Sequence, residues 1–223
     1  MNRNQVLLGI IVLALVALGA FAWYTTHDSG ELAPPSATTA DQSATPGDYA
    51  VTLGSPDAPI KLIEYAAPMC PICANFDMNE FPRLKSQYID TGKVFYTFRV
   101  FPIGNPDIGA EGIARCLPKA QYLPFIDFLY RNQDKWDPDG HVILDVRASL
   151  VAMAATTGMS ADQAGRCIDD KDTQARTMRI AQEGAARYGV NGTPTFILDE
   201  RVAYTGEWPW AALKAALDAK LPK

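Results

Sequence analysis

Two cysteines three residues apart, Cys70 and Cys73, are the residues of this chain best suited to chemistry. The β-branched, apolar run 60–65 predicts a buried strand, and the short connection 66–69 brings Cys70 to the start of a helix. The first amides of a helix are unsatisfied and its N-terminus carries partial positive charge, so a thiolate is favoured at Cys70. Pro71 suits the first helical position, because its missing N–H costs nothing there. We therefore predict that the two thiols form and break a disulfide.

The alternatives are a metal site, a Cys–His hydrolase and an inert short disulfide. A zinc site needs four ligands, usually in two close pairs, whereas Cys116 and Cys167 each stand alone. The two histidines, His27 and His141, lie in a linker and beside a turn, so neither a Cys/His metal cluster nor a Cys–His hydrolase is indicated. We expect no metal and no other cofactor.

Length and composition indicate one folded domain. The chain has 223 residues and 48% hydrophobic content, enough to bury a sizeable core. The net charge is −5 and no basic patch is present, which excludes a nucleic-acid-binding role. We expect a monomer.

The N-terminal region predicts export from the cytoplasm. Residues 6–24 are an apolar stretch of 19 residues preceded by Arg3, long enough to cross a bilayer with the N-terminus in the cytoplasm. A signal peptide cleaved at about Ala22 is the rival interpretation, and it would leave a soluble protein. We favour an uncleaved anchor (1–24) followed by a flexible linker (25–49), with the rest in a compartment where disulfides persist.

Periodicity predicts the elements of the folded part. Residues 70–88 read as a helix kinked at Pro82, and 93–101 as a second, central strand. Five helices follow between about 104 and 190; Met178, Ala181, Ala185 and Tyr188 mark the apolar face of the last. A hairpin at 195–204, with its turn at Asp199-Glu200, and a helix at 208–221 close the chain.

This order resembles the thioredoxin fold with an inserted α-helical domain, an α/β architecture. The residues that carry the resemblance are the Cys70–Cys73 motif at the first helix and Gly192-Thr193-Pro194-Thr195-Phe196 before the hairpin. More closely, the chain resembles the DsbA-like thiol:disulfide oxidoreductases of bacterial envelopes. The similarity covers about residues 50–221, with the helical insertion at about 104–190, and includes the turn 53–59 that leads into the first strand.

The resemblance implies roles for particular residues. Glu64 matches a buried acid beneath the active site, which would exchange a proton with Cys73. Thr193 and Pro194 match a cis-proline loop that faces the disulfide and binds an extended substrate peptide. Pro71 and Ile72, between the cysteines, complete the substrate-binding residues.

The chain departs from the family pattern at two places. The dipeptide between the cysteines is Pro71-Ile72, without the histidine of strongly oxidising members, which predicts a less depressed pKa for Cys70 and a less oxidising disulfide. Cys116 and Cys167 are absent from many members. In an oxidising compartment we expect them to form a structural disulfide, as in a subset of this family.

The expected function is a membrane-tethered thiol:disulfide oxidoreductase facing the periplasm. Cys70 would be the exposed, attacking sulfur and Cys73 the shielded, resolving one. The expected partners are unfolded or newly exported cysteine-containing proteins and a membrane redox partner that reoxidises the cysteine pair. The alternatives are a disulfide isomerase or reductase of the same fold, or a non-catalytic thioredoxin-like binding module or chaperone.

Overall fold

A computed structural model describes residues 50–221. The expected anchor or signal segment (1–24) and the linker (25–49) lie outside these residues. Within the described part, no helix combines the length and apolar character that crossing a membrane requires.

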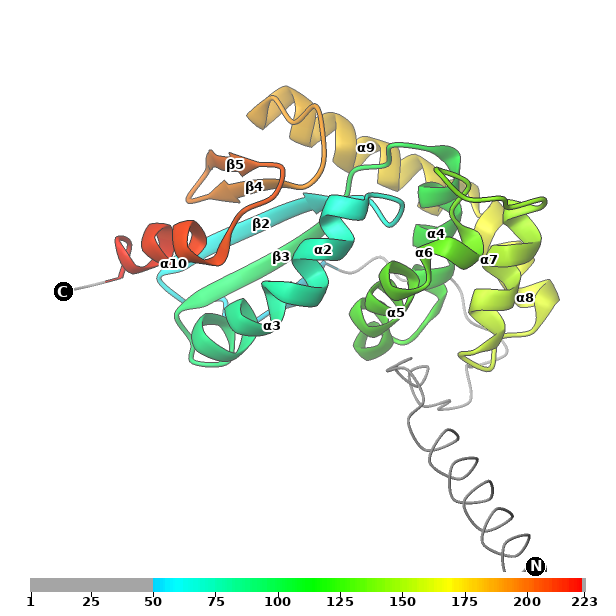
Figure 1. Cartoon of the computed structure of the whole chain (residues 1–223), viewed down its shortest axis with the longest axis horizontal. Helices are drawn as coiled ribbons and strands as arrows, with labels where there is room; N and C mark the ends of the chain where they lie inside the picture. The colour runs from blue at the N-terminus through cyan, green and yellow to red at the C-terminus, as the bar shows by residue number, and fades with distance from the viewer. Residues whose placement is uncertain (1–49, 222–223) are drawn as a thin grey trace, which may run out of the picture. The chain divides into compact units, whose positions relative to one another are not determined.

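A five-stranded mixed sheet lies at the centre of the fold, with strand order β1-β3-β2-β4-β5 (Figure 1). The two central strands, β2 and β3, pair in parallel, and all other neighbours are antiparallel. The strands are β1 (Val51–Leu53), β2 (Ile60–Ala66), β3 (Val94–Val100), β4 (Thr195–Leu198) and β5 (Arg201–Thr205). β1, which the sequence analysis missed, pairs with residues 96–98 of β3.

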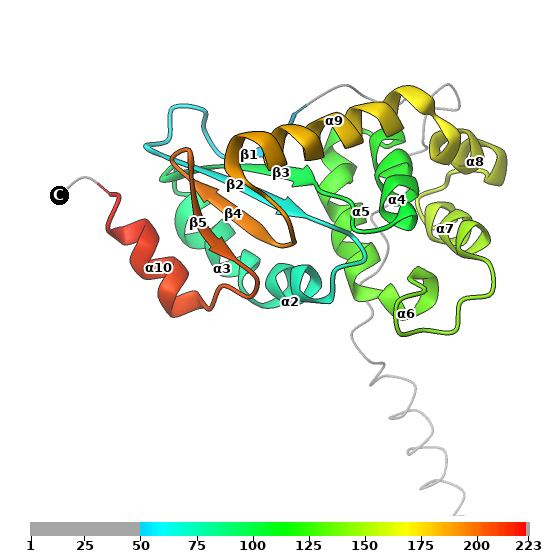
Figure 2. The same ribbon diagram turned by 90° about the horizontal axis from the view of Figure 1, so that it is seen from above.

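Helices cover both faces of the sheet (Figure 2). α2 (Pro71–Asn79), α3 (Phe81–Leu84) and α10 (Trp210–Asp218) lie on one face, and α9 (Lys171–Tyr188) lies on the other. A helical block between β3 and α9 stands beside the sheet. It comprises α4 (Asn105–Cys116), α5 (Lys119–Arg131), α6 (Gln133–Trp136), α7 (Val146–Ala155) and α8 (Ala161–Asp169).

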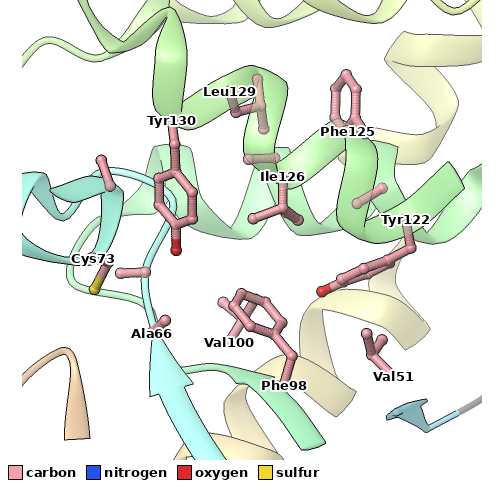
Figure 3. Close-up of a cluster of buried hydrophobic side chains, with 14 of the residues drawn as sticks. Val51, Ala66, Cys73, Phe98, Val100, Tyr122, Phe125, Ile126, Leu129 and Tyr130 are labelled. Carbon is pink, nitrogen blue, oxygen red and sulfur yellow. The ribbon is translucent and has the colours of Figure 1, made fainter. Parts of the chain in front are cut away.

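The sheet and the helical block share one hydrophobic core. Phe98 and Val100 of β3 face Tyr122 and Ile126 of α5 (Figure 3), and the rings of Phe98 and Tyr122 meet edge to face at 6.1 Å between centroids. This packing holds the start of α2 between the sheet and α5, which positions the cysteine motif.

The helix is interrupted at Glu80, two residues before Pro82, rather than kinked at the proline itself. α2 ends at Asn79, Glu80 forms its C-cap, and α3 restarts with Pro82 in its first turn, followed by a π-helix, η1 (Lys85–Ile89). A proline inside a helix clashes with the carbonyl four residues earlier, whereas the first turn tolerates it. The chain therefore breaks before the proline.

The apolar face expected for α9 is also wrong in part. Met178 is 41% exposed and Ala185 is exposed, whereas Thr173, Thr177, Ala181 and Gly184 are buried. A Cβ on Gly184 would lie 2.6 Å from the ring of Tyr65. Small residues therefore form the buried face, because α9 packs closely against the sheet.

Candidate active site

Cys70 is the N-cap residue of α2, and Pro71 follows at its first turn. The Sγ of Cys70 accepts a hydrogen bond from the backbone N–H of Cys73 at 3.2 Å. Both cysteines are free thiols in this structure. The cap geometry thus directs an unsatisfied helix amide at the sulfur, as the residue order predicts.

The surroundings of Cys70 favour its thiolate. A hydrogen bond from the Cys73 side chain lowers the pKa of Cys70 to about 6, against the opposing effect of burial; Thr193 and the amides of Ile72 and Cys73 add to the lowering. Cys70 is only 4% exposed, so the expectation of an exposed sulfur is wrong. The 193–194 loop explains this, because the carbonyl oxygen of Thr193 lies 3.4 Å from Sγ and accepts a hydrogen bond from the thiol.

Cys73 and Glu64 are two buried acidic groups near Cys70. Cys73 is fully buried, and burial raises the pKa of its thiol well above the ordinary value, with the charge of Glu64 adding to the effect. Glu64 on β2 is 3% exposed and accepts a hydrogen bond from the hydroxyl of Tyr96 at 2.6 Å. Burial raises the pKa of Glu64 to about 8, although the Tyr96 hydrogen bond opposes the rise. A carboxyl group poised near neutral pH suits proton exchange with a thiol.

The loop before β4 meets the cysteines from the other side. The Thr193–Pro194 peptide bond is cis, and the carbonyl of Pro194 accepts a hydrogen bond from Gly206 N at 2.8 Å. Pro194 is buried, whereas Pro71 and Ile72 are exposed, Ile72 by 42%. The structure thus brings together Cys70, Cys73, Glu64, Pro71, Ile72, Thr193 and Pro194.

Comparison with known proteins agrees with this geometry. A family model described as thioredoxin matches residues 47–219. The chain belongs to the thioredoxin family, and it is a DsbA-like member. The crystal structure of Wolbachia pipientis alpha-DsbA1 superposes with a TM-score of 0.68 at 27% identity, covering 81% of this chain and 95% of that one.

Curated relatives of the chain have names that refer to disulfide chemistry. The probable disulfide bond formation protein D of Bacillus cereus is 28% identical over 231 residues, covering 100% of both chains. A putative protein-disulfide oxidoreductase of Rickettsia bellii is 33% identical over 154 residues, covering 65% of this chain. The chain spans 58% of the length of the Rickettsia bellii protein. It spans 62% of the length of a third relative, from Rickettsia prowazekii.

The DsbA-like site includes positioning residues that the sequence analysis missed. The carboxylate of Asp107, in the first turn of α4, accepts hydrogen bonds from the backbone N–H of Met69 at 2.7 Å and of Ile103 at 2.8 Å. The side chain of Gln133 donates to the carbonyl of Pro68 at 2.8 Å. Both therefore tie the loop before Cys70 to the helical block. Asp107 stands three residues after Gly104, the N-cap of α4, and this capping spacing was the available signal.

Cys116 of α4 and Cys167 of α8 are bonded to each other in the helical block, as expected. The helical block is part of the described fold (Figure 1). The disulfide joins the C-terminal end of α4 to α8, where the helices approach so closely that a Cβ on Gly112 would lie 2.3 Å from the carbonyl oxygen of Cys167. Between residues 50 and 221, no three His, Cys, Asp or Glu side chains group together as a metal site would require.

Proposed function

We propose that this protein introduces disulfide bonds into exported proteins through Cys70 and Cys73. One observation carries the proposal: a cysteine at the N-cap of α2, with a pKa lowered to about 6, lies beside a buried cysteine whose pKa is raised. A low thiol pKa stabilises the reduced enzyme relative to its disulfide and so makes the disulfide more oxidising. Such a pair accepts electrons from client thiols.

The reaction divides between the two sulfurs. A client thiolate attacks Sγ of Cys70 in the oxidised enzyme, the Cys70–Cys73 bond breaks, and its electron pair leaves on Cys73. The Glu64 carboxyl group protonates the Cys73 thiolate. A second client thiolate then attacks the client sulfur of the mixed disulfide, releasing the oxidised client and the Cys70 thiolate, which is the better leaving group because its pKa is low.

Thr193, Pro194, Pro71 and Ile72 bind the client peptide in this proposal. The edge formed by the 193–194 loop offers backbone groups to an extended chain, and backbone pairing imposes little sequence preference. Ile72, half exposed beside Cys70, offers an apolar contact. These features suit unfolded clients of varied sequence.

The cellular setting follows from the sequence outside the described residues. The apolar run 6–24 favours an envelope protein, tethered or released at about Ala22, whose clients are newly exported cysteine-containing chains. Each client oxidation leaves the enzyme reduced, so a membrane redox partner must restore the Cys70–Cys73 disulfide.

The test measures oxidation of a reduced, unfolded secreted protein by stoichiometric oxidised enzyme. We expect transfer of one disulfide per enzyme molecule and none with Cys70→Ser. The redox state of Cys70–Cys73 in cells then separates the directions: a mostly oxidised pair supports an oxidase, whereas a mostly reduced pair would indicate an isomerase or reductase. Absence of transfer with folded wild-type protein would leave only a binding module or chaperone.

A further inference from the structure

An exposed carboxylate that has no part in the proposed reaction stands beside the 193–194 loop. Glu207 lies in the segment that joins β5 to α10, and this segment passes beside α2 (Figure 2). The residue before it, Gly206, donates a backbone hydrogen bond to the carbonyl oxygen of Pro194 at 2.8 Å. Glu207 therefore follows directly after a residue that is bonded to the cis-proline loop.

A buried ring holds the backbone on the other side of Glu207. Trp208 is 2% exposed, and its ring centroid lies 5.1 Å from that of Phe196 and 5.4 Å from that of Tyr204, on which it stacks. Aromatic contacts of this kind bury a large apolar area and prefer a defined geometry. Because both of its neighbours in the chain are tied down, the backbone of Glu207 has a fixed position at the edge of the site.

The side chain of Glu207 is held as well, by two asparagines of α2. Nδ2 of Asn75 donates a hydrogen bond to Oε1 of Glu207 at 3.2 Å, and Nδ2 of Asn79 donates to Oδ1 of Asn75 at 2.8 Å. Asn75 stands three residues after the exposed Ile72, which corresponds to about 4.5 Å of helix rise. These bonds place the carboxylate less than one helical turn along α2 from a proposed client-binding residue, and they use Oε1.

Glu207 carries a negative charge that no cation offsets. Within residues 50–221, no lysine, arginine or histidine forms an ion pair with it. Glu200, an exposed glutamate at the turn between β4 and β5, is instead paired with Arg187. An exposed carboxylate is stable in water without a partner, so the charge alone does not indicate binding. Glu207 differs from an ordinary surface acid because its position is fixed beside the reactive site.

We propose that Glu207 selects clients that carry a lysine or arginine within two residues of the reacting cysteine. The client sulfur must meet Sγ of Cys70, which lies 3.4 Å from the carbonyl oxygen of Thr193. An extended peptide along the 193–194 loop advances about 3.3 Å per residue, so a side chain one or two residues from the cysteine comes alongside the segment that starts at Gly206. There Glu207 attracts a basic side chain and repels an acidic one. This inference deepens the proposed function and rests on it.

The experiment compares two peptides as reductants of the oxidised full-length protein. Each peptide has two cysteines; one has an arginine beside each cysteine, and the other has a glutamate in the same places. The measured quantity is the ratio of the second-order rate constants for the arginine and glutamate peptides. We expect Glu207→Gln to lower this ratio about fivefold at low salt, as an exposed charge pair allows, and Glu207→Lys to lower it further. At about 1 M salt, where the Debye length is about 3 Å, wild type and variants should converge.

The ratio separates selection from a structural role. Every protein meets the same two peptides, so differences in the intrinsic reactivity of their thiols cancel. A Glu207 that only held the segment 206–209 in place would slow both peptides equally when replaced and would leave the ratio unchanged. Asn75 is a positioning residue, and Asn75→Ala, which releases the carboxylate, should give a ratio between those of wild type and Glu207→Gln.

Glu183→Gln is the matched control. It removes an exposed glutamate from α9, on the opposite face of the sheet, and should keep the wild-type ratio. The same ratio in wild type, Glu207→Gln and Glu207→Lys would overturn the proposal, as would an equal fall in Glu183→Gln, which would reflect net charge alone. Folded wild-type protein that reacts with neither peptide would reject the proposed function and this inference with it.

Discussion

The two cysteine pairs of this chain are equally hidden from solvent but lie at opposite ends of helices. Cys70 is 4% exposed and Cys116 is 3% exposed, so burial does not distinguish them. Cys70 caps the N-terminus of α2, where backbone amides favour a thiolate, whereas Cys116 is the last residue of α4, where the carbonyl end of the helix disfavours one. Position on the helix, rather than exposure, separates the reactive pair from the structural pair.

The largest expected effect comes from replacing either cysteine of the reactive pair, because Cys70 and Cys73 have different roles. With disulfide-bonded clients, Cys73→Ser should accumulate mixed disulfides at Cys70, because the Cys73 thiolate that would attack Cys70 Sγ and release the client is missing. Cys70→Ser should be inactive and trap nothing, since Cys73 is buried and its thiol pKa is raised. Non-reducing electrophoresis with a cysteine-containing client checks both. Faster alkylation of Cys73 than of Cys70 near neutral pH would reverse the assignment.

The next effect concerns Glu64, the buried acid near the reactive cysteine pair. The folded-state pKa of Glu64 is raised from 4.5 to about 8, chiefly by burial. Its contribution to stability is therefore fully present below pH 4.5 and is lost as pH rises toward 8. Relative to Glu64→Gln, wild-type protein should lose up to about 1.4 kcal/mol of unfolding free energy per pH unit within this window.

Urea unfolding of both oxidised proteins from pH 4 to pH 9 measures this difference. Asp57→Asn, which removes an exposed acid, serves as the control for a general loss of negative charge. A constant difference between wild type and Glu64→Gln across the range would mean that the pKa of Glu64 is the same in the folded and unfolded states.

Removing the second pair should lower stability without changing turnover. Cys116 and Cys167 close a loop of 51 residues, and the chain-entropy model assigns roughly 4 kcal/mol to such a bridge. We expect Cys116→Ala with Cys167→Ala to lower the melting temperature and to leave peptide oxidation near the wild-type rate. A large loss of peptide oxidation in the folded double variant would show that the helical block tunes the site.

Short-range signals in the sequence indicate where individual elements of the fold begin and turn. Ser160 and Gln163 have the spacing of a capping box, and both hydrogen bonds of that box are present at the start of α8. The turn at Asp199-Glu200 predicts the hairpin, and both residues adopt positive φ there. Each of these features depends on residues within one turn of the chain, so the sequence alone suffices to predict it.

Contacts between distant segments were not predictable in the same way. The close approach of Gly184 to Tyr65 and the Asp107 hydrogen bond to Met69 join residues far apart in the chain. The burial of Cys70 has the same origin, because Thr193 covers it from a loop 123 residues away. The cysteine motif thus indicates its chemistry from the sequence, whereas its exposure depends on tertiary packing.

The smallest expected effect tests whether α2 alone sets the reactivity of Cys70. Ile72 is 42% exposed and lies between the cysteines, where strongly oxidising relatives are expected to carry a histidine. In Ile72→His, an imidazolium near the thiolate should lower the pKa of Cys70 from about 6 by about one further unit, which makes the disulfide more oxidising by about 30 mV. Thiolate absorbance against pH measures the first change, and equilibrium with glutathione measures the second. Ile72→Leu is the matched control, because it keeps an apolar side chain of the same size. An unchanged Cys70 pKa in Ile72→His would mean that a charge at residue 72 does not stabilise the thiolate beyond what the helix amides and the Cys73 thiol already provide.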